Sequence, residues 1–233
     1  MIPGLKHSQS IYNNILKNYV KHDIYWLDLG CGHRILPFWL YEEEKNLVNI
    51  SQLVVGIDYN LSSLKNHKSI YIKIRGDITK LPFKKKYFDL VTANMVVEHL
   101  NEPDIQFKEI SRILKPKGIF ILHTPNIFNL WIIIARLVPD KIKLVFIKLL
   151  EGREEKDIFD VHYKVNSRKK ILNVASKSGF QVLKLKMIVS TPVLSIIPPL
   201  VIFELIWIRI LMMTPFKLFR SNIIAILINN DSF

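Results

Sequence analysis

The sequence lacks features whose absence excludes whole classes of protein. It has one cysteine, Cys31, so no disulfide can form within the chain, and the disulfide framework of a small secreted domain is excluded. Residues 1–20 contain no continuous apolar core of signal-peptide length and no small-residue cleavage site. We therefore expect no export and a cytoplasmic location.

Acidic residues are also scarce, because 20 Asp and Glu face 33 Lys and Arg, which gives a formal net charge of +13. This charge draws the protein to anionic partners: nucleic acid, phospholipid headgroups or phosphorylated substrates. The length of 233 residues and the hydrophobic content of 49% suffice for one large domain with a buried core. We therefore expect a single domain over residues 1–233, led by an amphipathic helix within residues 1–23.

Short apolar runs, typical of buried strands, alternate with helical patterns in the first half of the chain. The expected strands are residues 24–29, 53–58, 70–77, 88–94 and 118–124, with helices over 61–66 and 104–114 and a last strand over 223–229. Alternation of buried strands with helices predicts an α/β protein with a parallel sheet covered on both faces. In such sheets, ligands bind at the carboxyl ends of the strands.

The stretch "WLDLGCGHRILPFW" places two glycines, Gly30 and Gly32, directly after the first expected strand. Glycine adopts backbone conformations closed to other residues and lets a ligand approach the main chain. A dinucleotide-binding fingerprint would have a third glycine at the position of Ile35, so the pattern does not favour a pyrophosphate. A tight turn without a ligand is the alternative at this point.

Polar residues at the next strand ends favour a nucleoside-like ligand. Asp58 ends the second expected strand, where a carboxylate can accept both hydroxyls of a ribose, and Tyr59 can lie against an adenine. Asp77 and Ile78 follow the third strand and suit an adenine amino group and ring, and Asn94 ends the fourth strand. Four successive strand ends therefore supply glycines, two acids and an amide.

With these residues the chain resembles the class I S-adenosylmethionine-dependent methyltransferases, especially those that methylate small molecules and glycans. The resemblance is carried by "LDLGCG", "GIDYN", "GDITKLPF", "FDLVTANMVVEHL", "EISRILKPKGIFILHTPN" and "ASKSGFQVLKL", in this order over about residues 25–187. It implies a Rossmann-like seven-stranded sheet, mostly parallel, with an antiparallel last strand. It also implies a cofactor-binding half over residues 24–125 and a substrate-side half over residues 126–233.

The resemblance implies S-adenosylmethionine as cofactor and assigns its contacts. These come from Asp28, Gly30, Gly32, Asp58, Asp77, Ile78 and Asn94. Tyr59 is a further expected cofactor contact, because its ring can lie against the adenine. An acid such as Asp28 can serve the ammonium group of the methionine tail, directly or through water. The chain departs from the family in one place, since many members have a third glycine where this sequence has Arg34. No metal is expected.

Few catalytic side chains are needed, because the cofactor carries the reactive group and the protein orients it. His99 and His162 are the candidate bases for a hydroxyl acceptor, with a structural role as the alternative for His99. His123, Asn126 and Tyr163 are candidate contacts of the acceptor. Among the remaining polar groups, Cys31 is interpreted as a packing residue and Lys84–Lys86 as a solvated turn.

The second half of the chain adds apolar segments that contain basic residues. The most apolar is an insertion over residues 191–219, but Pro198, Pro199, Glu204 and Arg209 interrupt it, so no run of about 20 apolar residues exists. Trp207 and the basic residues favour a helix that lies in a membrane interface, at a peripheral location. Cover helices of the core or a dimer face are the alternatives.

These observations favour an enzyme that methylates a hydroxyl of a glycan, a lipid-linked molecule or another amphiphile at a membrane surface. A quinone-biosynthesis methyltransferase and a non-catalytic methyltransferase-like binding subunit are the alternatives. Nucleic acid is not the expected partner, because the fourth strand ends in Asn94-Met95-Val96-Val97 and not in an Asn-Pro-Pro-Tyr type motif. The sequence does not indicate an oligomeric state.

Overall fold

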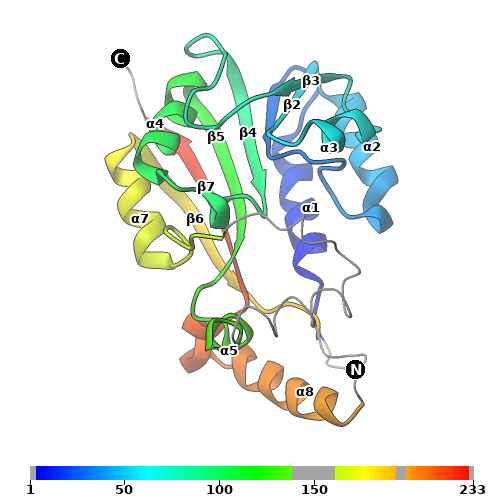
Figure 1. The fold of residues 1–233 in the computed structure, drawn as a ribbon, viewed down its shortest axis with the longest axis vertical. Helices are drawn as coiled ribbons and strands as arrows, with labels where there is room; N and C mark the ends of the chain where they lie inside the picture. Colours follow the sequence, from blue (N-terminus) through cyan, green and yellow to red (C-terminus); the bar gives the residue numbers. More distant parts are fainter. Residues whose placement is uncertain (1–3, 138–160, 193–197, 231–233) are drawn as a thin grey trace.

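The computed structural model describes residues 4–137, 161–192 and 198–230, and Figure 1 shows a central sheet with helices on both faces. The sheet has seven strands in the order β3-β2-β1-β4-β5-β7-β6. Their bounds are β1 Tyr25–Leu29, β2 Leu53–Asp58, β3 Ile72–Arg75, β4 Phe88–Asn94, β5 Leu114–Pro125, β6 Phe180–Ile188 and β7 Asn222–Asn229. The Rossmann-like fold class expected from the sequence is confirmed.

The direction of the strands divides the sheet into two parts. β1 pairs in parallel with β2 and β4, β2 with β3, and β4 with β5. β7 runs antiparallel to both β5 and β6, so the last strand of the chain is inserted between them. The carboxyl ends of β1 to β5 therefore lie at one edge, where ligands bind in sheets of this kind.

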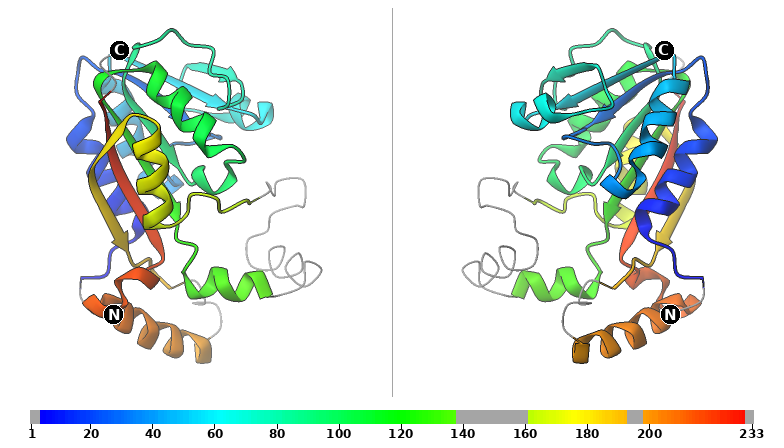
Figure 2. Two further views of the ribbon diagram at one scale, coloured as in Figure 1. Left: turned by 90° about the vertical axis from the view of Figure 1, so that its left-hand side faces the viewer. Right: turned by 90° about the vertical axis from the view of Figure 1, so that its right-hand side faces the viewer.

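Helices cover both faces of the sheet, as the two side views in Figure 2 show. Their bounds are α1 Ser8–Tyr19, α2 Tyr41–Ile50, α3 Leu61–Asn66, α4 Pro103–Ile113, α5 Leu130–Leu137, α7 Arg168–Lys177 and α8 Pro198–Met212. α4 and α7 bury Phe107 and Ile171 in one core layer, while α1 and α2 bury Tyr12 and Leu47 in the other. Three short 3₁₀ helices complete the described chain: η1 Phe38–Leu40, η2 Val97–His99 and η4 Thr214–Phe219.

Local sequence explains where several helices begin. The Ser167 hydroxyl accepts a hydrogen bond from the Lys170 N–H and caps α7. The Asn60 side chain accepts from the Ser63 N–H at the start of α3. Proline, which has no N–H to satisfy, begins α4. α2 was not expected from the sequence, and its first turn carries three glutamates, which the positive end of the helix dipole favours.

α5 and α8 lie together beyond the carboxyl ends of the parallel strands, away from the other helices (Figures 1 and 2). The Arg220 guanidinium donates to the carbonyls of Leu211 and Met212 at the end of α8 and to that of Met187 in β6, at 2.9, 3.1 and 3.1 Å. One side chain thus ties α8 to the sheet. Among the described residues, no helix combines the length and the apolar character that crossing a membrane requires.

Phe107 is the residue of α4 that the core depends on most directly. Its ring lies edge-on to Phe120 of β5, with centroids 5.5 Å apart, and is fully buried. We expect Phe107→Ala to lower the free energy of unfolding by about 3–5 kcal/mol, because it removes a buried ring and leaves a cavity. Ile105→Ala, at a side chain that is 48% exposed on the same helix, is the control and should change it little. Urea unfolding measures both, and equal effects would contradict this core.

Candidate active site

The strand register brings the predicted cofactor residues to one edge of the sheet. Leu29, the last residue of β1, is opposite Ile57 of β2 and Ala93 of β4. Asp58 is opposite Arg75 at the ends of β2 and β3. The glycine turn after β1 therefore lies between the ends of its two neighbouring strands, as the sequence predicts.

The two glycines of the turn are required for different reasons. Both have positive φ angles, 61° at Gly30 and 53° at Gly32. A Cβ atom at Gly30 would lie 2.5 Å from the Val96 side chain, whereas one at Gly32 would have no atom within 4 Å. Gly30 therefore permits close packing beneath the turn. Gly32 leaves open space above it, which a ligand can occupy.

Asp58 lies beside this turn and shapes it. One carboxylate oxygen accepts the Gly32 N–H at 2.8 Å, and the other accepts the Asn60 N–H at 2.7 Å. Because a carboxylate oxygen can accept two hydrogen bonds, each oxygen still has a position for a ligand hydroxyl. Tyr59 next to it is 69% exposed, and the Arg75 guanidinium lies 5.5 Å from the centroid of its ring. An exposed aromatic ring thus follows directly, in the chain, the acid that binds the open glycine.

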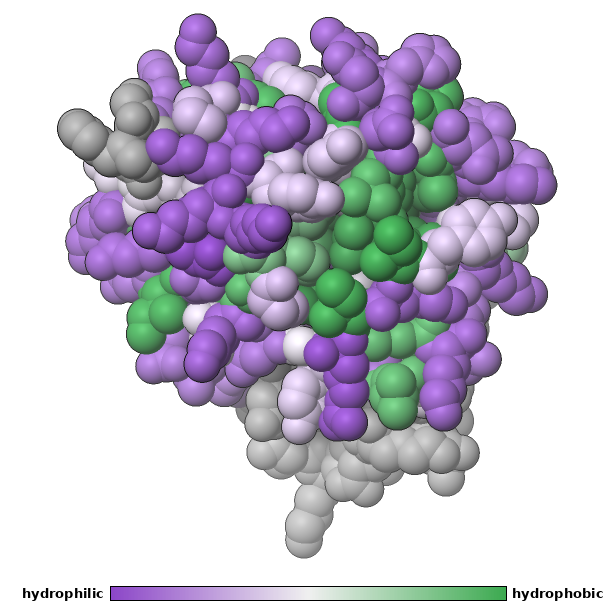
Figure 3. All heavy atoms as spheres, turned by 90° about the horizontal axis from the view of Figure 1, so that it is seen from above, coloured by the Kyte–Doolittle hydropathy of each residue, from purple (hydrophilic) through white to green (hydrophobic). Residues whose placement is uncertain are grey.

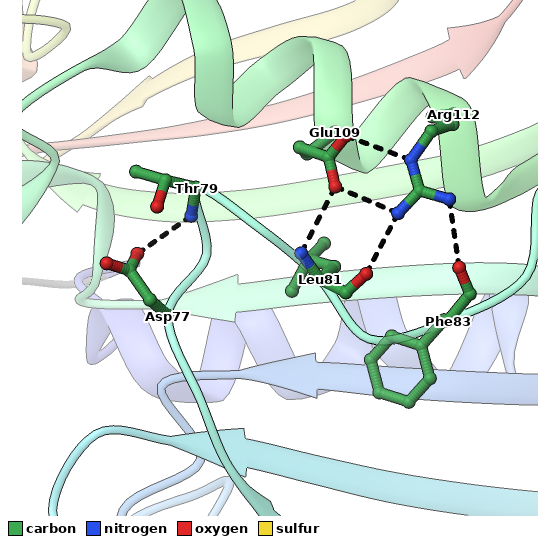
Figure 4. Close-up of polar contacts among 6 residues, drawn as sticks. All are labelled: Asp77, Thr79, Leu81, Phe83, Glu109 and Arg112. Atoms are coloured by element: carbon green, nitrogen blue, oxygen red, sulfur yellow. Dashed lines mark hydrogen bonds and ion pairs between the residues drawn. The ribbon is translucent and has the colours of Figure 1, made fainter.

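The loop after β3 is held by a clamp from α4, drawn in Figure 4. The Arg112 guanidinium donates to the carbonyls of Leu81 and Phe83, each at 2.9 Å, and also binds Glu109. Glu109 in turn accepts the Leu81 N–H at 3.1 Å. This hydrogen bonding with Arg112 holds the pKa of Glu109 below its usual value, so the clamp is ionic. The clamp fixes the downstream end of the loop that carries the predicted adenine contacts.

Asp77 and Ile78 in this loop differ in exposure. Asp77 is exposed at the edge, and one of its carboxylate oxygens accepts the Thr79 N–H at 2.8 Å. Ile78 is half-buried and packs against the core layer of α4 and α7. The geometry leaves Asp77 accessible to a ligand amino group, and the roles of both residues stay predictions.

Asp28 lies inside the sheet and is only 1% exposed. The Thr92 hydroxyl donates to it and accepts from the Trp26 indole N–H, so the three side chains form a buried chain. Burial raises the pKa of Asp28 to about 8, against a weaker opposing effect of the Thr92 hydrogen bond. At neutral pH the side chain is mostly uncharged. The predicted contact with a ligand ammonium group would need an exposed carboxylate, and Asp28 does not provide one.

Asn94 has a structural role that leaves its side chain no free hydrogen-bonding position. Its amide pairs reciprocally with that of Gln9 in α1 at 2.9 and 3.1 Å and also donates to the Ile35 carbonyl. Its oxygen additionally lies 2.9 Å from Nδ1 of His123. Two donors and two acceptor positions are thereby used. The predicted cofactor contact from this side chain would require one of these bonds to break.

The predicted acceptor contacts His123 and Asn126 are both fully buried. His123 stacks on Tyr12, and burial lowers the pKa of its imidazole to about 3, so the ring is neutral. The Asn126 amide donates to the carbonyls of Leu218 and Arg220 at 2.8 and 2.7 Å. It joins the end of β5 to the segment after α8. Neither side chain is accessible to an acceptor, in contrast to the sequence-based expectation.

The two candidate bases lie on segments that the structure brings together. The N–H groups of His162 and Tyr163 both donate to the carbonyl of Glu98, at 2.8 and 3.1 Å. His99 follows Glu98 in η2, and its side chain is half-buried, whereas His162 is exposed. Tyr163, also half-buried, has a positive φ of 49° at this junction. The backbone at Glu98, next to His99, is therefore hydrogen-bonded to the backbone of His162 and Tyr163, and the chemical roles of these residues stay predictions.

Glu98 is the residue of this region that the sequence reasoning missed. It is 6% exposed, and its carboxylate accepts the Thr124 hydroxyl at 2.9 Å, while Thr124 accepts the Asn166 amide at 2.6 Å. Burial raises the pKa of Glu98, and the nearby His99 counteracts this. Its place between Val97 and His99 in an otherwise apolar run was the available signal. Glu98 holds η2, β5 and the segment before α7 together.

The buried carboxyl of Asp28 predicts how stability depends on pH. Its pKa in the folded protein, about 8, lies above the ordinary value of 3.8, so the folded state retains a proton that the unfolded state releases. The stabilisation by this proton is complete below about pH 4 and is lost as pH rises toward 8. We expect the stability of Asp28→Asn relative to the wild type to rise by roughly 10³-fold in the folding equilibrium constant between pH 5 and pH 9, because the wild type loses about tenfold per pH unit up to pH 8. Urea unfolding at both pH values measures this, and parallel pH curves would contradict it.

The residues at this edge fit an adenosine-containing ligand. The open space at Gly32, the free acceptor positions of Asp58 and the exposed ring of Tyr59 supply the contacts that a backbone-bound ribose and adenine need. The second acid, Asp77, is accessible on the adjacent loop.

Comparison with known proteins agrees with this fit. A family model described as a methyltransferase domain matches residues 27–122. A probable S-adenosylmethionine-dependent methyltransferase of Mycolicibacterium smegmatis is 25% identical over 135 residues, 54% of this chain and 49% of that protein. A demethylmenaquinone methyltransferase of Lactobacillus johnsonii is 32% identical over 142 residues, 54% of this chain and 56% of that protein. The chain thus spans about half the length of these two curated relatives.

A solved structure extends the likeness to nearly the whole chain. The S-adenosylmethionine-dependent methyltransferase of Mesorhizobium loti superimposes with a TM-score of 0.60 and 16% identity, over 94% of this chain and 96% of that one. At this identity the likeness concerns the fold, which is the one derived above from strand order and register. Fold, family model and relatives agree: residues 27–122 match a methyltransferase domain, and the chain has the fold of the class I S-adenosylmethionine-dependent methyltransferases, whose cofactor is S-adenosylmethionine.

Proposed function

We propose that the protein is an enzyme that transfers a methyl group from S-adenosylmethionine to a hydroxyl of an amphiphilic acceptor, lipid-linked or glycan, at a membrane surface. The observation that carries the proposal is an exposed apolar helix, α8, beyond the same sheet edge that holds the glycine turn (Figure 1). An acceptor with an apolar part could rest near α8 while its hydroxyl reaches this edge.

The cofactor would be held by the residues at the ends of β1, β2 and β3. Asp58 is the group for the ribose hydroxyls, Tyr59 and Ile78 for the faces of the adenine, and Asp77 for its amino group. When bound, S-adenosylmethionine supplies a methyl group on a positively charged sulfur. The chain orients this group and excludes water, which is most of what such a transfer requires.

A hydroxyl acceptor also has to lose a proton, for which His99 and His162 are the candidates. The carbonyl of Glu98 binds the N–H of His162, so η2 and the segment before α7 are joined at the residues that carry both imidazoles. An imidazole titrates near neutral pH and is the usual general base. His162 is the more exposed of the two and the better placed to meet an acceptor.

The surface of α8 supports docking on a lipid bilayer. Ile202, Phe203 and Ile206 are 63%, 71% and 54% exposed on one face of the helix. Leu218 in η4 adds another apolar side chain, 56% exposed, and the basic Lys217 is exposed beside it. Apolar insertion and attraction of basic residues to anionic lipid act together at such surfaces. Trp207, expected from the sequence to contact the membrane, is half-buried instead, with Ile208 buried beside it.

A quinone precursor is the second candidate acceptor. The relative from Lactobacillus johnsonii is named as a demethylmenaquinone methyltransferase, and it matches this chain at 32% identity over about half its length. A quinone with an apolar side chain is also an amphiphile, so docking through α8 would serve it equally. A binding subunit without turnover is the non-enzymatic alternative. Incubation with labelled S-adenosylmethionine and membrane extract separates the three by labelled lipid or glycan, labelled quinone, or binding alone.

The role of Asp58 is tested by binding of S-adenosylhomocysteine. We expect Asp58→Ala to weaken binding by about 2 kcal/mol, because charge-assisted hydrogen bonds to two hydroxyls are lost. Asp104→Ala, at an exposed carboxylate on α4, is the charge-matched control and should leave affinity unchanged. Calorimetric titration gives both values. Since Asp58 also holds the glycine turn, thermal unfolding verifies that the variant is folded, and a folded variant with unchanged affinity would refute the ribose contact.

Membrane docking is tested by co-sedimentation with vesicles of neutral or anionic phospholipid. We expect a Phe203→Glu and Ile206→Glu double variant to bind anionic vesicles about tenfold or more weakly than the wild type, because two exposed apolar anchors are replaced by charges. The control is Ile105→Glu with Leu183→Glu, at side chains that are each 48% exposed on α4 and β6. Equal binding by the two double variants, or no binding by the wild type, would contradict docking through α8.

A further inference from the structure

A hollow lies at the opposite end of the sheet from the cofactor residues. It has a volume of about 390 Å³ and is formed where the turn before β4, the ends of α4 and α7, and the end of β7 meet. Leu114, Gly179 and Asn229 in its lining are at the amino ends of β5 and β6 and the carboxyl end of the antiparallel β7. Figure 3 looks down on this end, much of which is covered by hydrophilic side chains.

Cations dominate the lining of this hollow. Lys85, Lys86, Lys108, Arg112 and Lys177 contribute to it from three separate segments of the chain. Arg112 is neutralised by Glu109, but the four lysines are exposed, and in the described ranges none of them is paired with a carboxylate. Four like charges around one concave site raise the local positive potential and concentrate anions there.

A solvated turn, the interpretation given to Lys84–Lys86 from the sequence, does not account for this arrangement. Lys177 is in the last turn of α7, where a cation is favoured by the helix dipole whether or not a ligand is present. Lys108 is in the middle of α4, and Lys85 and Lys86 belong to no helix, so the dipole does not explain them. What these residues share is that they line the same hollow.

A buried hydroxyl gives a second and independent indication of a ligand. Ser178 lines the hollow, is 4% exposed, and its Oγ has no hydrogen-bond partner. Burying a polar group without a hydrogen-bond partner destabilises a protein. A ligand that accepts a hydrogen bond from this hydroxyl would remove the destabilisation. A hydroxyl beside several ammonium groups matches the donors that bind phosphate oxygens.

We propose that this hollow binds a small soluble anion that carries a phosphomonoester or pyrophosphate group, at a site separate from methyl transfer. Its volume is within the range of small-molecule sites and suits one such group with a small substituent. A phospholipid headgroup would offer the same chemistry. However, α8 is at the other end of the molecule, so a bilayer bound at α8 would not reach this hollow (Figure 1).

Calorimetric titration with inorganic pyrophosphate tests the site in the full chain. We expect a Lys108→Gln and Lys177→Gln double variant to bind about tenfold to thirtyfold more weakly, because two charges at contact distance are removed. The control is Lys21→Gln with Lys45→Gln, which removes the same charge at exposed positions away from the hollow, and it should bind like the wild type. No binding by the wild type, or equal loss in both double variants, would overturn the proposal.

A smaller variant distinguishes a built site from general charge attraction. Ser178→Ala removes the unpartnered hydroxyl without changing the charge, and we expect pyrophosphate to bind about twofold to tenfold more weakly while the protein stays folded. Unchanged affinity would leave only non-specific attraction and overturn the site. Vesicles containing phosphatidic acid form the other arm. A lipid headgroup would be the ligand if three results came together: the Phe203→Glu and Ile206→Glu variant binds these vesicles, the Lys108→Gln and Lys177→Gln variant does not, and pyrophosphate does not bind at all. This outcome would also overturn the proposal.

Discussion

The hydrogen bond from the Gly32 N–H to the Asp58 carboxylate is the contact on which the cofactor site depends. It joins the turn after β1 to the end of β2, two segments 26 residues apart, and so fixes the open space at Gly32 relative to the acid beside it. Parallel strands bring their carboxyl ends to one edge, but their pairing does not fix the distance between the loops that follow them. A side-chain bond between the two ends sets the remaining distance. The same carboxylate therefore builds the turn and is available to a ligand.

Polar residues near the site serve mainly to assemble it. Asn94, His123 and Asn126 are at the ends of strands, as expected, yet their side chains join α1 to β4 and β5 to the segment after α8. Buried amides in such networks stabilise a structure only when each donor and acceptor is paired. The donors and acceptors of Asn94 are all used. Exposed groups such as Asp77 and Tyr59 are what remains for ligands.

The succession of strands along the first half of the chain and the glycine turn could be predicted from the sequence because both depend on local patterns, whereas the seven-stranded sheet with its antiparallel last strand was implied only by the family resemblance. The bounds of β2, β4 and α3 agree with the expected ranges, and the last strand lies where it was expected. The orientation of Asn94 could not be predicted, because its partner Gln9 is 85 residues away and belongs to a helix whose docking depends on the whole fold. The same holds for Glu98 in η2, whose partner Thr124 is 26 residues away on β5.

Arg220 gives α8 a fixed position, and this has a geometric consequence. Its guanidinium binds carbonyls at the end of α8 and in β6 together, so the helix is attached to the same sheet that positions the glycine turn. If α8 rests on a bilayer, the protein therefore fixes the distance between the cofactor and the lipid surface. This distance does not change with how far an acceptor protrudes from the bilayer. Such an enzyme would select acceptors by the length of the spacer between their apolar anchor and their hydroxyl. Selectivity of this kind requires no pocket shaped to the rest of the molecule.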